Sequence, residues 1–322
     1  NIPFQSDHAG EAYGGNGRNI VAFVKGNTKE RPLGFAAHMD QIEPCRNVNP
    51  VINGNIISTD KTTTLGGDDK AGISAIMEAV EDIIESGVPH RDIYLVFTCS
   101  EEISMMGTKH MDMSMLPCKE LVVVDATGGA ETLAYKAPAM EAIEITFKGK
   151  KAHAGIEPEK GINAIVVASK AISKMHIGRI DYETTSNIGH IEGGSATNIV
   201  TDEVTFTAEI RSHSMEKLAA EVAHMEQCCK EAVEEMGACY EMKHEMAYPV
   251  LSLEEDCELI QDTVNAMAEE RITANKMIIG GGSDANVLAG HGYKSVILGC
   301  GMINVHTVEE ALDTDETWKV TK

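Results

Sequence analysis

The stretch LGFAAHMD, residues 33–40, combines an apolar run typical of a buried strand with the polar motif His38-Met39-Asp40 at its carboxyl end. Three further strand-like runs are each followed closely by carboxylates or an imidazole: DIYLVFTCS (92–100) by Glu101 and Glu102, LVVV (121–124) by Asp125, and SVILGCG (295–301) by His306. Ligands of open α/β sheets bind beyond the carboxyl ends of the strands. The four strand ends therefore predict one shared site.

The segment GGDDKAGISAIMEAVEDIIESG, residues 66–87, predicts a helix between the first two of these strands. Its apolar residues recur at three- and four-residue intervals, and Gly87 follows the last of them. Alternation of strand and helix predicts an α/β fold, with a mostly parallel sheet and helices on both faces.

The pattern changes near residue 137. Half-exposed strands and two helices follow one another within about 110 residues in the order strand, helix, strand, strand, helix and strand. The clearest of these elements are strand 140–149, helix 161–176, strand 203–213, helix 215–236 and strand 239–248. This order is typical of a ferredoxin-like α+β domain. We therefore expect a catalytic domain formed by residues 1–136 and 246–322, interrupted by an inserted lid or dimerisation domain at residues 137–245.

Composition restricts the classes of partner. The 322 residues include 50 acidic and 27 basic side chains, which gives a net charge of −23, and only 4% are aromatic. Such a charge disfavours nucleic acid and anionic membranes as partners. Eight cysteines without a Cys-x-x-Cys pair, and the lack of an apolar span or secretory leader, favour a cytoplasmic protein with reduced thiols.

Five residues form a candidate metal-ligand set. Two imidazoles and three carboxylates suit a pair of divalent cations that share one carboxylate. The five are His38, Asp68, Glu102, Asp125 and His306. Taken singly, each also has an ordinary structural interpretation, such as a polar strand end or an acidic first helical turn. The glycines before Asp68 permit an unusual backbone, which a bridging carboxylate could require.

Other motifs are less specific. The loop Gly280-Gly281-Gly282-Ser283-Asp284 lacks the pattern of a phosphate-binding loop or a dinucleotide fingerprint, and a backbone that approaches a substrate closely is the better interpretation. His153, Asn198 and Arg211 are non-specific when considered alone.

The ordered set His-x-Asp, Gly-x-Asp-Asp-Lys, Glu-Glu, Asp and Asn-x-His resembles, over essentially the whole chain, the two-domain co-catalytic zinc peptidases. This family includes peptidase T, glutamate carboxypeptidases, aminoacylase and succinyl-diaminopimelate desuccinylase. The resemblance implies that His38 and Asp125 bind one metal ion, that Glu102 and His306 bind the other, and that Asp68 bridges them. It implies Zn²⁺ for both ions, although nitrogen and oxygen ligands also accept Co²⁺ or Mn²⁺.

The same resemblance assigns further roles. Asp40 would orient the first histidine, and Glu101 would act as the general base. His153 would reach a neighbouring active site across a homodimer and stabilise the oxyanion, while Asn198 and Arg211 would hold the backbone and the carboxylate of the substrate. Gly282 and Ser283 are expected at the substrate. The family also leads us to expect a helical segment before Asn1 and a last helix after Lys322.

An Asp at position 125 and the Gly-Gly-Ser-Asp loop at 281–284 place the chain nearest peptidase T. We therefore expect a di-zinc exopeptidase that removes the N-terminal residue from short peptides. Three alternatives remain open at this point. They are an N-acyl-amino-acid amidohydrolase that uses the same metals, a metal-free peptide-binding protein, and a nucleotide-binding oxidoreductase, which the missing glycine fingerprint disfavours.

Overall fold

The computed structural model describes residues 2–322. The chain divides into two compact units: the first runs to Ala137 and resumes at Leu251, and the second covers Pro138–Val250. Residue 245, where the sequence predicts the end of the inserted domain, lies inside β13 (Cys239–Tyr248), and the second unit continues past it to Val250.

The first unit contains a 12-stranded mixed sheet within residues 2–322, with the main order β1-β2-β6-β3-β7-β16-β17-β5-β4 and with β8 joining β14, β15 and β16. Its strands are β1 (Phe4–Ser6), β2 (Ile20–Val24), β3 (Leu33–His38), β4 (Pro50–Asn53), β5 (Ile56–Thr59), β6 (Ile93–Thr98), β7 (Glu120–Thr127), β8 (Thr132–Ala137), β14 (Leu251–Ser252), β15 (Asn275–Ile278), β16 (Lys294–Ile303) and β17 (Ala311–Asp313). Its helices are η1 (Ala9–Tyr13), α1 (Gly67–Ser86), α2 (Met106–Lys109), η2 (Met113–Met115), α5 (Glu258–Glu269), α6 (Asp284–Gly290) and α7 (Thr314–Val320).

Four neighbouring strands, in the order β6-β3-β7-β16, are mutually parallel. Their carboxyl ends consequently lie at one edge of the sheet, as the sequence predicts. One detail differs from the expected pattern, because Asp125 lies inside β7 rather than after it.

Alternate residues of these strands face two different cores. In β7, Val122 and Val124 belong to a core that also contains residues of α1 and α5, whereas Leu121 and Val123 belong to a core that contains residues of α6. The near-continuous apolar strands are therefore buried on both faces, as expected of a parallel sheet. The predicted arrangement of helices on both sides of the sheet is confirmed.

Helix α1 confirms the predicted helical segment with two local differences. Ile76 and Val80 are buried on its sheet-facing side, whereas Met77 and Ile84 are 43% and 54% exposed. The backbone at Asp68 departs from helical angles, with φ −80° and ψ 103°. The methionine-rich segment 105–115 forms two short elements, α2 and η2.

The second unit contains a five-stranded antiparallel sheet in the order β10-β11-β12-β9-β13, within the described residues. Its elements are β9 (Ala139–Lys148), η3 (Pro158–Lys160), α3 (Ala164–Ile172), β10 (Gly178–Arg179), β11 (Thr184–Gly193), β12 (Glu203–Ser212), α4 (Met215–Met236) and β13 (Cys239–Tyr248). Apart from the short β10, this is the predicted ferredoxin-like order of strand, helix, strand, strand, helix and strand.

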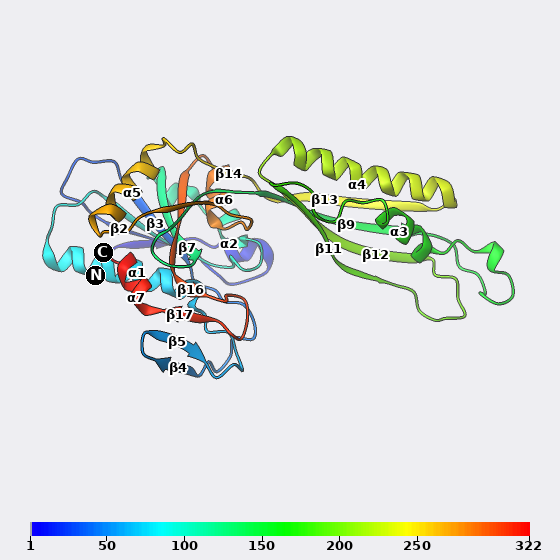
Figure 1. Ribbon diagram of the computed structural model, residues 1–322, viewed down its shortest axis with the longest axis horizontal. Coiled ribbons are helices and arrows are strands. Elements are labelled where there is room, and N and C mark those ends of the chain that lie inside the picture. The colour runs from blue at the N-terminus through cyan, green and yellow to red at the C-terminus, as the bar shows by residue number, and fades with distance from the viewer. Residues whose placement is uncertain (1) are drawn as a thin grey trace. The chain divides into compact units, whose positions relative to one another are not determined.

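One face of this sheet is covered by α3 and α4 (Figure 1). Phe147 and Phe206 point to the helices and are fully buried, with their ring centroids 6.2 Å apart. On the other face, the hydroxyls of Thr146 and Thr205 lie 2.9 Å apart in a hydrogen bond. The alternation of apolar and polar residues thus separates a packed face from a polar one.

The insertion begins and ends at a single point of the first unit. The residues that flank it, Ala137 of β8 and Leu251 of β14, are paired partners in an antiparallel ladder and are both fully buried. All eight cysteines are unpaired. Among residues 2–322, no helix combines the length and the apolar character needed to cross a membrane.

Candidate metal centre

The Asp68 carboxylate lies between two imidazoles. Its Oδ1 atom is 2.8 Å from Nε2 of His38, and its Oδ2 atom is 3.2 Å from Nε2 of His306. His38 is supplied by the end of β3, Asp68 by the start of α1, and His306 by the loop after β16. A carboxylate with one oxygen directed to each of two nitrogen ligands is the arrangement expected of a bridging ligand.

Each imidazole also faces a second carboxylate. The Nε2 atom of His38 is 3.7 Å from Oδ1 of Asp125, and Nε2 of His306 is 3.0 Å from Oε2 of Glu102. The structure therefore brings the five predicted ligands together as two histidine–carboxylate pairs that share Asp68. The pairing is the one that the family resemblance implies.

Asp40 connects His38 to the Glu101–Glu102 turn. Its carboxylate accepts the backbone N–H groups of Glu101 and Glu102 at 3.0 and 3.1 Å, and it lies 3.4 Å from Nδ1 of His38. A carboxylate in this position favours the tautomer that leaves the other ring nitrogen unprotonated. The predicted orienting residue is thus where such a role requires it.

Glu310 holds the loop that presents Asp68. Its carboxylate, only 1% exposed, accepts the backbone N–H groups of Leu65, Gly66 and Asp68 at 2.7 to 2.9 Å. Gly66 has a φ of 77°, and a Cβ at this position would lie 2.4 Å from the side chain of Gln41. The sequence does not indicate this role of Glu310, because a single acid in a polar loop carries no recognisable signal.

Asp69 has a structural role beside the bridging residue. Its Oδ2 atom accepts the backbone N–H of His38 at 3.2 Å, and its Oδ1 atom accepts that of Gly72 at 3.1 Å. These hydrogen bonds tie the end of β3 to the start of α1. Of the two consecutive acids, Asp69 therefore forms hydrogen bonds with backbone N–H groups, whereas Asp68 contacts the two imidazoles.

Electrostatic coupling links Asp68 to both imidazoles. Burial acts to raise the pKa of Asp68, but the hydrogen bonds with His306 and His38 hold that pKa well below its ordinary value. Burial acts to lower the pKa of His38, but Asp40 and Asp68 raise it above its ordinary value. The centre therefore contains anionic groups in need of positive charge, which a bound cation or a protonated histidine provides.

Glu101 is in a different electrostatic state. Burial raises its pKa well above the ordinary value, and the charges of Asp125 and Asp284 raise it further. Asp284, which is 3% exposed, accepts hydrogen bonds from the hydroxyls of Thr98 and Thr108 at 2.5 and 2.6 Å. A carboxyl group that holds its proton more tightly than usual is suited to proton transfer.

The centre opens on a cavity of about 390 Å³. Glu101 and three of the candidate ligands, Asp68, Asp125 and His306, line one part of it, and residues 280–283 line another. The predicted substrate residues Gly282 and Ser283 are thus at the same cavity. The hydroxyl of Ser283 caps helix α6 by accepting the N–H of Ala285 at 3.2 Å. The Ser283 hydroxyl therefore fixes the point where the loop of residues 280–283 ends and α6 begins.

The remaining predicted residues lie in the second unit. The loops of His153 and Asn198 are joined, because the N–H of Ala154 donates to the carbonyl of Asn198 at 2.9 Å. The guanidinium of Arg211 donates two hydrogen bonds to Glu209, each of 3.0 Å. Both His153 and Asn198 are exposed.

The side chains of the first unit fit a pair of divalent cations. Two sets of three side chains each have potential ligand atoms that all lie within 4.8 Å of one another. One set is His38, Asp68 and Glu102, and the other is His38, Asp69 and Asp125. Among the described residues, Oε1 of Glu102 is buried and has no hydrogen-bond partner. Imidazole and carboxylate donors match the preferences of Zn²⁺ and related ions. A two-domain α/β metallohydrolase is the class that this fold and this centre define.

Comparison with known proteins specifies the class further. Residues 140–237 match the peptidase dimerisation domain, and residues 48–156 match M42 glutamyl aminopeptidase. The chain is 39% identical to the uncharacterised protein YqjE of Bacillus subtilis, with 99% of this chain and 86% of that protein covered. Two crystal structures are also similar over 99% of this chain and 86% of theirs. They are aminopeptidase PepT of Bacillus cereus (35% identity, TM-score 0.92) and a tripeptidase of Staphylococcus aureus (34%, 0.96). The chain belongs to the peptidase T-like members of the M20 peptidase family.

The role of Glu310 can be tested through metal affinity. Glu310→Gln replaces one acceptor oxygen by an amide NH₂ that would face a backbone N–H, so the Asp68 loop should lose its fixed position. Supporting residues of this kind typically contribute about 10–100-fold to metal affinity. We expect a loss of that size for Zn²⁺ in competition titrations. The control is Glu309→Gln, which changes an exposed side chain paired with Lys61. Equal affinities in the two variants would contradict the role of Glu310.

Proposed function

We propose that the protein is a metal-dependent aminopeptidase that removes the N-terminal residue from short peptides, tripeptides in particular. The observation that carries this proposal is the Asp68 carboxylate, directed by its two oxygens to His38 and His306. The similarity to an aminopeptidase and to a tripeptidase supports the same conclusion.

We assign one cation to His38 and Asp125, the other to Glu102 and His306, and the bridging position to Asp68. Zn²⁺ is the proposed ion, with Co²⁺ or Mn²⁺ as substitutes. When bound, such a pair supplies Lewis acidity that lowers the pKa of water and polarises the scissile carbonyl. The protein side chains would carry out the proton transfers and would bind the substrate.

Glu101 is the proposed general base. It lines the same cavity as Asp68, Asp125 and His306, and its backbone N–H is fixed by Asp40. It would take a proton from the attacking water and pass it to the leaving amine. Its neighbour Glu102 contacts His306 instead, which separates the two adjacent acids into a proton carrier and a ligand.

We infer that the substrate binds in this cavity. Its wall includes apolar side chains that offer a surface for a peptide side chain, namely Met277, Ile279, Ile297, Met302 and Val305. Gly282 and Ser283 would bring backbone groups close to the peptide. By resemblance, we propose that Asn198 and Arg211 hold its backbone and carboxylate. Arg211 would then exchange its contact with Glu209 for the substrate, since a guanidinium binds carboxylates through both oxygens.

The amidohydrolase alternative is not favoured. By resemblance, the Asp at position 125 places the chain nearest peptidase T, and the two crystal structures at 34–35% identity are of an aminopeptidase and a tripeptidase. The metal-free binding protein is disfavoured as well, because all five candidate ligands converge.

Hydrolysis of matched substrates tests the proposal. We expect the protein loaded with Zn²⁺ or Co²⁺ to release the N-terminal residue from an unblocked tripeptide and to leave its N-acetylated counterpart intact. Chelation should abolish turnover, and added metal should restore it. Preferential cleavage of the acetylated substrate would overturn the aminopeptidase assignment. Two bound metal ions with no hydrolysis of either substrate would reject peptidase activity on short peptides.

The role of Glu101 has a separate test. Glu101→Gln removes the proton acceptor with little change in size, and we expect kcat to fall by about 10²–10⁴-fold, the usual contribution of a general base. The metal content, measured by mass spectrometry, should stay unchanged. The comparison variant is Glu102→Gln, which should lower metal content as well as activity. Wild-type kcat in Glu101→Gln would sink the assignment.

We also propose a homodimer formed through the inserted unit, in which His153 acts on the partner's substrate. The match of residues 140–237 to the peptidase dimerisation domain supports the dimer. Sedimentation equilibrium should give twice the chain mass, and His153→Ala should lower kcat without changing that mass. A fully active monomer would reject the cross-dimer role.

A further inference from the structure

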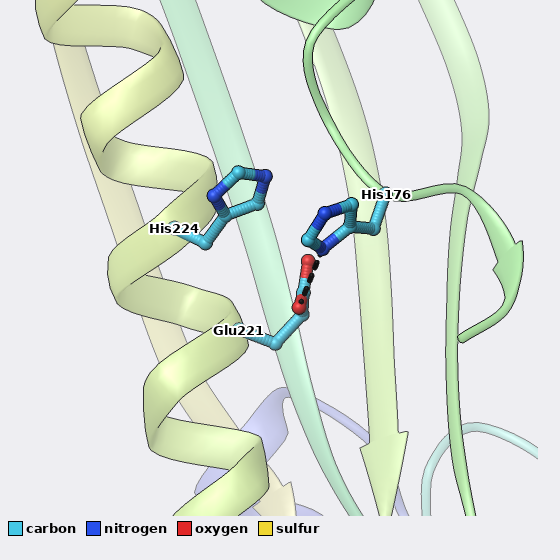
Figure 2. Close-up of side chains that lie close together, drawn as sticks. All are labelled: His176, Glu221 and His224. Atoms are coloured by element: carbon cyan, nitrogen blue, oxygen red, sulfur yellow. Dashed lines mark hydrogen bonds and ion pairs between the residues drawn. The ribbon is translucent and has the colours of Figure 1, made fainter. Parts of the chain in front are cut away.

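A second group of potential metal ligands lies in the inserted unit and has no part in the proposed reaction. His176 belongs to the turn after α3, and Glu221 and His224 belong to α4. One ligand atom from each of the three lies within 4.8 Å of the other two. Figure 2 shows the Glu221 carboxylate directed at the His176 ring, with the His224 ring beside it.

Local structure explains why these side chains meet. Glu221 and His224 are three residues apart on α4, so they share one face of the helix. Helices α3 and α4 pack together, which brings the turn at His176 over that face. The two imidazoles are stacked, with centroids 4.0 Å apart and planes inclined by 15°.

The Glu221 carboxylate is incompletely satisfied. The residue is 8% exposed, and its Oε2 atom accepts a hydrogen bond from Nδ1 of His176 at 3.1 Å. Its Oε1 atom is buried and, among the described residues, has no hydrogen-bond partner. A buried acceptor without a partner is unfavourable, because it has given up the hydrogen bonds that it would make with water. A simple ion pair with His176 therefore explains only one of the two oxygens.

His224 is held as metal-binding histidines commonly are. Its Nε2 atom lies 3.2 Å from the carbonyl oxygen of Lys174. Because a carbonyl can only accept, Nε2 carries the proton and the other ring nitrogen has the lone pair. Ligating histidines typically donate their second N–H to a carbonyl or carboxylate in this way.

We propose that His176, Glu221 and His224 form a binding site for a Zn²⁺-class cation, distinct from the pair assigned to the first unit. Tetrahedral donors about 2.0–2.1 Å from an ion are roughly 3.3 Å apart. The 3.1 Å separation of His176 Nδ1 and Glu221 Oε2 nearly matches this value. The cation would take the place of the proton between these two atoms. Two imidazoles favour Zn²⁺, Ni²⁺ or Cu²⁺ over Ca²⁺ and Mg²⁺.

The site would join the end of α3 to the middle of α4. The His176 side chain is 54% exposed and can rotate, so the small adjustment that brings all three donors onto one ion is accessible. To act as a ligand, Nδ1 of His176 must present its lone pair, so the neutral ring would carry its hydrogen on Nε2. Binding should stabilise the folded inserted unit by mass action.

Zinc stoichiometry of the full chain tests the site. We compare wild type with His224→Ala and His176→Ala, titrate with Zn²⁺ and count bound ions by mass spectrometry after removal of free metal. Each variant should bind one ion fewer than wild type. This difference does not depend on how many ions the first unit holds, so it remains informative if the proposed peptidase function fails.

A matched control distinguishes a built site from a surface histidine. His244 of β13 forms a comparable pair with Glu141, Nδ1 to Oε2 at 3.1 Å, without belonging to a group of three potential ligands. His244→Ala should keep the wild-type zinc count. In addition, Zn²⁺ should raise the unfolding temperature of His244→Ala more than that of His224→Ala. Equal zinc counts in wild type and both cluster variants, or equal losses in His244→Ala and His224→Ala, would overturn the proposal.

Discussion

The shared carboxylate of Asp68 is the constraint on which the rest of the centre depends. Both imidazoles are placed relative to its two oxygens, and Asp125 and Glu102 are in turn placed relative to the imidazoles. Several buried acids at such short range would repel one another and would retain protons. Positive charge between these acids makes the arrangement favourable. The same convergence of strands that brings the acids together therefore also creates a site that favours cations.

The parallel strands deliver these groups, but the loops fix them. Strand order brings four carboxyl ends to one edge of the sheet, and that alone leaves each side chain free to turn. Two further carboxylates remove this freedom through backbone hydrogen bonds: Asp40 binds the Glu101–Glu102 turn, and Glu310 binds the loop of Asp68. Acids therefore serve as ligands and also as the supports that position the ligands.

The sequence predicts the parts of this structure that depend on periodicity. The apolar run at 33–38 corresponds residue for residue to β3, and the helix at 215–236 corresponds to α4. Strand ends then indicate which polar residues meet. The contribution of Glu310 could not be predicted, because its partners are backbone N–H groups about 240 residues away. The His176 cluster could not be predicted either, because it is created by the packing of α3 on α4.

The single exit point of the inserted unit has an evolutionary and practical consequence. Because Ala137 and Leu251 are paired neighbours in one ladder, the chain leaves and re-enters the first unit at adjacent positions. Replacing the intervening 138–250 segment by a short turn would convert β8 and β14 into an ordinary hairpin. The insertion can thus be gained, exchanged or lost as a module while the sheet that carries the metal ligands keeps its order.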